Sequence, residues 1–374
     1  MPTKETAQVG KAQEDVQYFE TGIIGSGFSG LLAAIRLQKK HCNDFVLLER
    51  SSELGGTWQV NSYPGAEVDI PTSLYSISFI AYPFRKTFSP QSELLAYTNH
   101  IIDKFCLRKQ AKTNQTVTRL TYDESAFLWH VETESGERYS ARFIIDTSGV
   151  LANPHIPNIK GAETFEGPIF HTGHWDHAVA YEGKRVGVIG SGCSGAQIVP
   201  AIADKVSRLT LFMGKAQWIL PRSDRNYSAL ERFVRTLPGI RHLIRLWEKE
   251  AVSYKGITVS GYPNYFKVNG PNTGTGHSSQ ISYMQVAADY IVQAISAVKR
   301  YKSIRAINAK QGLQDAYVAE MREKMKKTVW QNATCTAFYR KNMTEEVTSL
   351  SPEPVTGFIF SRKWFNLSDY HLLK

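Results

Sequence analysis

The chain has 374 residues, of which 42% are hydrophobic and 21% charged, so its composition is that of a globular protein with room for two domains. Its net charge is +10, but the basic residues are scattered, which argues against a nucleic-acid partner. No run approaches the roughly 18 consecutive apolar residues of a membrane span, and residues 1–17 lack the apolar core of a secretion signal, so we expect a cytoplasmic protein. The four cysteines form no CxxC pair, so neither a metal site nor a redox-active disulfide is indicated.

A strand, a glycine-rich turn and a helix are expected in succession near the start of the chain. Residues 19–24 predict the strand, residues 31–37 predict the helix, and the turn between them contains Gly25, Gly27 and Gly30. Glycines there allow the tight turn, the approach of a pyrophosphate to the main chain, and close packing of helix on strand. The next predicted strand, 45–48, ends in Glu49, whose carboxylate can accept hydrogen bonds from a ribose diol. These residues predict a dinucleotide site.

The same design is repeated later in the chain, with a strand at 185–189, a second glycine turn and a strand at 209–212. The glycines of this turn are Gly190, Gly192 and Gly195. The second strand ends in Met213-Gly214-Lys215 instead of an acid, so nothing repels a 2'-phosphate and Lys215 can pair with it. The alternative reading of Lys215 as a solvated surface lysine stays open. The second unit predicts a dinucleotide with a 2'-phosphate.

Two longer strings accompany these turns. The first has the pattern FxGxxxHxxxW[P/D] and contains Phe165, Gly167, His171, Trp175 and Asp176. The second begins at Gly55-Gly56-Thr57-Trp58, continues through Tyr63-Pro64-Gly65 and ends at Asp69. Both resemble the fingerprints of the Baeyer-Villiger monooxygenases, and the resemblance extends over residues from about 19 to 218 and from about 256 to 370.

The resemblance implies an enzyme that binds FAD at the first glycine turn and NADPH at the second. NADPH reduces the FAD, and one oxygen atom of O2 is then inserted next to the carbonyl of a small-molecule ketone to give an ester or lactone. The implied fold class is α/β, with two dinucleotide-binding, Rossmann-like domains. The FAD domain is discontinuous, at 1–155 and 252–374 with the C-terminal helices, and a reduced NADPH domain is inserted at 156–251.

The resemblance also implies site residues. Asp69 is the expected catalytic residue, because the family places this carboxylate beside the flavin, where it holds an arginine. The fingerprint residues 165–176 are expected to couple movements of the two domains, although a structural histidine and a packing tryptophan are an alternative reading of His171 and Trp175. The expected cofactor-binding positions outside the glycine turns are Glu49, Thr57, Trp58, Gln59, Val60, Glu67, Val68, Asp69, Tyr75, Val117 and Lys215.

The chain departs from the family in one stretch, and this departure limits what the resemblance implies about function. After Trp218 the family has a long stretch with the active-site arginine and a second glycine-containing turn, but here only residues 219–255 precede the returning block at Gly256. Loss of an exon, an error in the predicted coding sequence and degeneration of the copy would each produce this pattern. An inactive cofactor-binding relative, an NADPH oxidase that releases peroxide, and a monooxygenase acting on nitrogen or sulfur remain alternatives, the last disfavoured by the string at 165–176. No pattern identifies the ketone or the oligomeric state.

Overall fold

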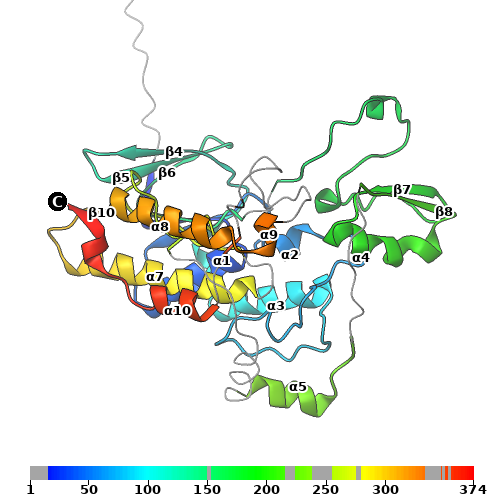
Figure 1. Cartoon of the computed structure of the whole chain (residues 1–374), viewed down its shortest axis with the longest axis horizontal. Coiled ribbons are helices and arrows are strands. Elements are labelled where there is room, and N and C mark those ends of the chain that lie inside the picture. The colour runs from blue at the N-terminus through cyan, green and yellow to red at the C-terminus, as the bar shows by residue number, and fades with distance from the viewer. Residues whose placement is uncertain are drawn as a thin grey trace, which may run out of the picture.

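The protein forms two unequal lobes, as the computed structural model shows (Figure 1). The structure describes residues 16–149, 153–214, 224–237, 255–274, 279–332, 347, 350–352 and 355–374. The larger lobe holds the beginning and the end of the chain, and the smaller lobe holds strands β7 and β8 with helix α4 (Figure 1). No helix among the described residues is long and apolar enough to cross a membrane.

A seven-stranded mixed sheet is the centre of the larger lobe, with strand order β3-β2-β1-β6-β5-β4 and with β9 paired to β6. Its strands are β1 (Gln17–Ile24), β2 (Phe45–Leu48), β3 (Ala111–Lys112), β4 (Val117–Asp123), β5 (Leu128–Thr133), β6 (Arg138–Asp146) and β9 (Tyr265–Lys267). β1 pairs in parallel with β2 and β6, with Thr21 opposite Phe45 on one side and Phe143 on the other. The carboxyl ends of these three parallel strands therefore meet at one edge of the sheet, where open α/β sheets bind ligands.

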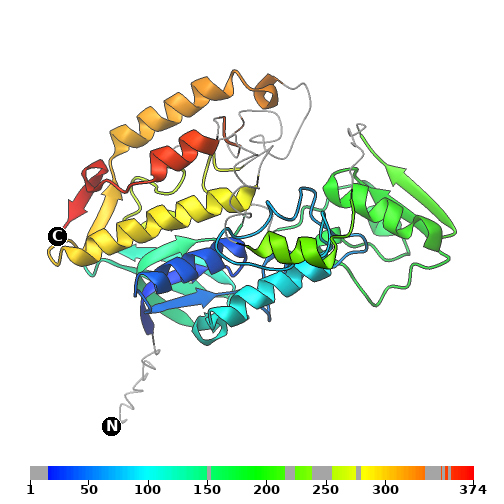
Figure 2. The same ribbon diagram turned by 90° about the horizontal axis from the view of Figure 1, so that it is seen from below.

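Helix α1 (Phe28–Lys39) is apolar on nearly all sides and is accordingly buried, with Leu31, Leu32 and Ile35 fully inaccessible to solvent. It contacts α3 (Gln91–Lys104) and α7 (Gln280–Arg300), and α10 (Val355–Arg362) packs on α7. Burying each such leucine or isoleucine contributes about 1.5–3 kcal/mol. Because α7 and β9 come from the end of the chain, the larger lobe is built from two separate segments, as Figure 2 shows by colour.

The remaining elements of the larger lobe are short or peripheral. They are α2 (Thr57–Val60), η1 (Leu107–Gln110), β10 (Ala306–Ala309), α8 (Gln311–Met325), α9 (Val329–Asn332), η6 (Leu367–Asp369) and β11 (Tyr370–Leu373). β10 and β11 form an antiparallel pair, with Ala306 opposite Leu373. This pair joins the end of the chain to the segment that follows α7.

The smaller lobe is a minimal strand-helix-strand unit. It contains β7 (Arg185–Ile189), α4 (Cys193–Ile202), η4 (Ala203–Lys205) and β8 (Arg208–Phe212), and the linker before it contains η2 (Ala162–Thr164) and η3 (Thr172–His174). β7 and β8 are parallel, and within the described part of the chain β7 pairs with no other strand. Apolar side chains are correspondingly exposed at the strand ends, with Ile189 63% and Phe212 57% accessible.

After the smaller lobe the chain returns to the larger one. The Tyr227 amide donates to the Arg85 carbonyl at 2.7 Å, and the Thr87 amide donates to the Arg225 carbonyl at 3.0 Å. Helix α5 (Ala229–Thr236) follows, and Ser228 and Glu231 close a capping box at its beginning. α5 lies below the larger lobe in Figure 1.

These observations confirm the expected α/β class, the discontinuous larger domain and the inserted, reduced second unit. The small lobe has two strands because the chain provides no third strand after β8 among the described residues. The domain boundaries at 155 and 251 stay predictions, and residue 251 lies outside the described residues.

Candidate nucleotide-binding sites and the junction between them

The first glycine turn joins β1 to α1 at the carboxyl edge of the large sheet. Gly25 has a φ of +97°, and a Cβ there would lie 2.8 Å from the Thr147 carbonyl oxygen. A Cβ on Gly30 would lie 2.0 Å from the Gly25 carbonyl oxygen. A Cβ on Gly27, in contrast, would meet only the Gly56 Cα, at 3.7 Å. Packing within the protein therefore requires Gly25 and Gly30, whereas the space at Gly27 is open, as the approach of a pyrophosphate demands.

Glu49 lies beside this turn, as expected from its place after β2. Its side chain is buried, and one carboxylate oxygen accepts hydrogen bonds from the Ser26 amide at 2.9 Å and the Ser26 hydroxyl at 2.6 Å. The other oxygen accepts from the Ser51 amide at 2.9 Å. Two carboxylate oxygens offer about four acceptor positions, so capacity remains for a ribose hydroxyl. The Gln115 amide donates to the Glu49 carbonyl at 2.8 Å, which brings the beginning of β4, including Val117, to this region.

Trp58 and Tyr75 form an aromatic corner behind the turn. Gly56, at the beginning of α2, approaches Gly27 so closely that a Cβ on it would lie 2.6 Å from the Gly27 Cα. Trp58 is buried, its ring stands edge-on to Tyr75 at 5.7 Å, and its indole N–H makes no hydrogen bond of normal geometry. Burial raises the pKa of Tyr75 to about 12, so this phenol stays neutral. An open turn beside an unsatisfied buried donor fits a polar cofactor such as FAD.

The second glycine turn, between β7 and α4, repeats the geometry of the first. Gly190 has a φ of +101°, a Cβ on Gly195 would lie 2.3 Å from the Gly190 carbonyl oxygen, and a Cβ on Gly192 would meet no atom within 4 Å. The two turns differ in what covers them. Thr147 packs against Gly25 and Gly30, whereas a Cβ on Gly190 would meet no atom within 4 Å. Lys215 lies outside the described residues.

The strip of residues 61–69, which carries the second half of the longer fingerprint, lies between the two turns and touches α4. Val68 is buried, whereas Asp69 is exposed and faces the first residue of α4. The Cys193 thiol lies beside the Asp69 carboxylate, and partial burial together with this negative charge raises the pKa of Cys193. Among the described residues, no arginine or lysine forms an ion pair with Asp69.

The fingerprint residues of the linker make mostly local contacts. His171 Nδ1 accepts from the Gly173 amide at 3.0 Å, and an Asp176 carboxylate oxygen accepts from the Ala178 amide at 2.9 Å. Trp175 stands edge-on to Phe170, with ring centroids 5.1 Å apart, and to Tyr181, at 5.9 Å. Phe165 is 62% exposed, and its ring lies over Gly167, where a Cβ would approach it to 2.6 Å. These contacts shape the linker, and the coupling role of these residues stays a prediction.

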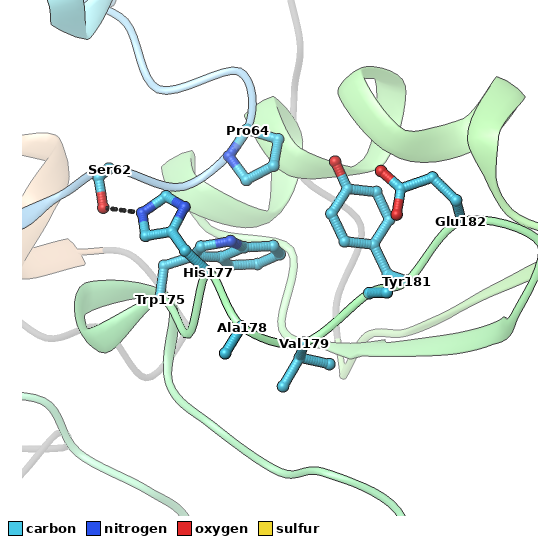
Figure 3. Close-up of a pocket in the computed structure, with 9 residues that line it drawn as sticks. Ser62, Pro64, Trp175, His177, Ala178, Val179, Tyr181 and Glu182 are labelled. Atoms are coloured by element: carbon cyan, nitrogen blue, oxygen red, sulfur yellow. Dashed lines mark hydrogen bonds between the residues drawn. The ribbon is translucent and has the colours of Figure 1, made fainter.

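A cavity of about 320 Å³ opens where the linker passes the strip (Figure 3). The residues that line it are Ser62, Pro64, Trp175, His177, Ala178, Val179, Ala180, Tyr181 and Glu182. The Ser62 hydroxyl and His177 Nε2 lie 2.7 Å apart and close one side (Figure 3). Apart from Trp175 and Pro64, which belong to the two fingerprints, these residues were not singled out from the sequence, because contacts between residues more than a hundred positions apart leave no local signal.

The expected site residues are thus divided between two neighbouring regions. Thr57, Gln59 and Val60 share helix α2 with Trp58, beside the first turn, and Glu67 lies on the strip, where its carbonyl oxygen accepts from Gln197 Nε2 at 3.0 Å. The first turn, Glu49 and the aromatic corner form one region. The second turn, Asp69 and Cys193 form the other.

Comparison with known proteins identifies the class of protein to which this chain belongs. The sequence model of the family described as pyridine nucleotide-disulphide oxidoreductase matches residues 23–237, so the chain belongs to this family. It is 28% identical over 486 positions to a Baeyer-Villiger monooxygenase of Streptomyces coelicolor, with 96% of this chain and 93% of that protein covered. It is 36% identical over 208 residues to a cyclohexanone 1,2-monooxygenase of an Acinetobacter species, covering 54% of this chain and 38% of that protein.

Solved structures confirm the fold. A closed crystal structure of cyclohexanone monooxygenase superposes with a TM-score of 0.85 at 18% identity, covering 96% of this chain and all of that one. A structure of OTEMO in complex with FAD and NADP gives a TM-score of 0.82 at 18% identity, covering 95% and 99%. The resemblance to the Baeyer-Villiger monooxygenases is thereby confirmed.

The alignment with the Streptomyces enzyme also bears on the expected gap. It extends over 486 positions although this chain has 374 residues, so a substantial part of the relative has no counterpart here. Among the described residues β7 pairs only with β8, which agrees with a segment missing after the second strand of this unit. A two-stranded sheet has marginal stability by itself, which makes its packing against the strip important.

Proposed function

We propose that the protein is an FAD- and NADPH-dependent monooxygenase that inserts one oxygen atom of O2 next to the carbonyl of a ketone, giving an ester or lactone. The observation that carries the proposal is the pair of glycine turns of matching geometry, on two lobes that meet along the strip of the fingerprint. The monooxygenase relatives and the solved neighbours that bind FAD and NADP support the same assignment.

The chain's own residues have defined tasks in this scheme. The open space at Gly27 and the free amides at the beginning of α1 receive the FAD pyrophosphate, and Glu49 accepts from the ribose. The beginning of α4, next to Gly192, receives the NADPH pyrophosphate in the same way. Bound FAD accepts a hydride from NADPH and activates O2. The protein orients the two cofactors and the substrate and stabilises charge.

The test begins with the flavin content of the purified protein and its reconstitution with FAD. Anaerobic addition of NADPH should bleach the flavin absorbance, and aerobic turnover with cyclic and aryl ketones should then yield an ester detectable by mass spectrometry. Folded protein that takes up no FAD, or FAD-loaded protein that NADPH does not reduce, would contradict the proposal.

A second candidate function is an NADPH oxidase that releases H2O2. It is favoured by Asp69, which has a thiol as its neighbour and forms no ion pair within the described part of the chain. Peroxide and ester yields separate the two functions.

NADPH should be preferred to NADH. The end of β8 carries no acid in Met213-Gly214-Lys215, so a 2'-phosphate meets one cation and no repulsion. We expect Lys215→Ala to lower the ratio of kcat/KM for NADPH to kcat/KM for NADH about tenfold. This is the effect of losing one charge-assisted hydrogen bond. Lys205→Ala is the matched control, because Lys205 ends η4 just before β8, away from the strand's carboxyl end, and it should leave the ratio unchanged. Equal use of both nucleotides by the unmutated protein would refute the assignment.

A further inference from the structure

Gln197 connects the two lobes through both atoms of its side-chain amide. Its Oε1 accepts a hydrogen bond from the Tyr63 hydroxyl at 2.8 Å, and its Nε2 donates to the Glu67 carbonyl at 3.0 Å. The opposite orientation of the amide would place two oxygens against each other at Glu67, so the network defines a single arrangement. Burial raises the pKa of Tyr63, which keeps this phenol protonated as the donor.

The backbone around these two hydrogen bonds is packed so closely that a side chain at Gly65 would not fit. Gly65 has a φ of +80°, and a Cβ on it would lie 2.5 Å from the Gln197 carbonyl oxygen and 2.8 Å from the Ala201 Cβ. The strip therefore lies directly on one face of α4. A small apolar core closes the same contact, formed by Tyr63, Ala66, Ile198 and Ile202. Neither lobe can slide along the other without breaking these contacts.

The contact through Gln197 is important because of where it lies relative to the two glycine turns. Gln197 lies about one helical turn beyond Cys193, which begins α4 at the second turn. On the other side, the strip continues from α2, and Gly56 at the beginning of α2 packs on Gly27 of the first turn. A short, rigid path thus leads from one phosphate-binding turn to the other through the Gln197 side chain.

We propose that Gln197 is a positioning residue that sets the separation of the two nucleotide-binding turns and thereby the distance for hydride transfer from NADPH to FAD. The inference rests on the proposed function. Hydride transfer needs reacting atoms about 3–3.5 Å apart, and a misplacement of about 1 Å can cost a factor on the order of 100 in rate. Gln197 touches neither cofactor turn, so it acts through the strip and α4.

The experiment compares Gln197→Leu with the unmutated holoenzyme. Leucine removes the acceptor of the Tyr63 hydroxyl and the Nε2 donor to the Glu67 carbonyl. We expect the rate of anaerobic flavin reduction at saturating NADPH to fall about 10- to 100-fold, while the dissociation constant for FAD stays within about twofold of the unmutated value. In a double-mutant cycle, Tyr63→Phe should add little to the effect of Gln197→Leu, because both remove the same bond.

Gln293→Leu is the matched control. Gln293 also bridges two segments through its amide, accepting from the Phe365 amide and donating to the Lys363 carbonyl, both at 3.2 Å, but it lies on α7 in the larger lobe. We expect it to leave flavin reduction unchanged. A structural role alone would lower the thermal midpoint in both variants and leave the reduction rate at saturation intact.

Hydrogen exchange on the cofactor-free protein gives a readout that does not depend on activity. The amides of Tyr63 and of residues 65–67 should exchange faster in Gln197→Leu and at the unmutated rate in Gln293→Leu. A normal reduction rate in Gln197→Leu, or an effect limited to NADPH affinity, would overturn the inference. If Gln197→Leu does not fold, Tyr63→Phe alone carries the same test. If NADPH does not reduce the unmutated protein, the proposed function is refuted instead. The exchange data would still show whether Gln197 stabilises the contact between the lobes.

Discussion

Gly27→Val should abolish FAD uptake while leaving the protein folded. The Gly27 backbone has a φ of −68°, which valine can adopt, and a Cβ there meets only the Gly56 Cα at a normal 3.7 Å. The added side chain instead occupies the space needed by the pyrophosphate. Losing two charge-assisted hydrogen bonds to the phosphates would weaken binding by about 100-fold or more. The measurement is the flavin absorbance of the purified variant and its dissociation constant for added FAD.

Two further variants make this test specific. Gly192→Val introduces the same side chain at the equivalent place in the second turn, where a Cβ meets no atom within 4 Å. It should retain FAD and lose NADP+ binding. Gly30→Ala should destabilise the fold itself, because its Cβ would lie 2.0 Å from the Gly25 carbonyl oxygen. A Gly27→Val protein that purifies with a full complement of FAD would show that the cofactor does not lie on this turn.

The two glycine turns were predictable because their signal is local. Strand, turn and helix follow within about 20 residues. The positive φ of Gly25 and the contact of Gly30 with the Gly25 carbonyl are local to the turn, whereas the contact of Gly25 with Thr147 is not. Glu49 was predictable for the same reason, since parallel strands end at one edge and a residue after β2 must lie beside the turn that follows β1. The reduced size of the second unit also followed from the sequence, because only residues 219–255 stand between Trp218 and Gly256.

The junction between the lobes was beyond prediction from the residues alone. Gln197 stands among apolar residues of α4, and a lone glutamine there gives no indication that its partners are Tyr63 and Glu67. The Ser62–His177 contact likewise joins distant segments, the strip and the linker. The family resemblance pointed to Asp69, yet the structure gives it a neighbour that the motif does not contain, Cys193. Contacts between distant segments depend on how the lobes dock, which the sequence pattern does not encode locally.

The 374-residue protein should consume NADPH with little oxygenation of ketones. The resemblance implies that Asp69 holds an arginine beside the flavin, but the Cys193 thiol is its neighbour here, and the segment expected to carry the arginine has no counterpart after Trp218. A missing electrostatic donor typically costs a factor on the order of 100 to 1000 in rate. Reduced cofactor then gives its electrons to O2, so that NADPH, H+ and O2 yield NADP+ and H2O2.

The test measures NADPH consumed, peroxide released and ester formed with a panel of cyclic and aryl ketones. We expect peroxide to approach the NADPH consumed. Asp69→Ala is the decisive variant. Removing a carboxylate that orients an essential arginine should abolish ester formation, whereas removing one that has no such arginine should leave the small ester yield unchanged. Ester formation that is nearly stoichiometric with NADPH and depends on Asp69 would show that another cation of the chain has taken the place of the arginine.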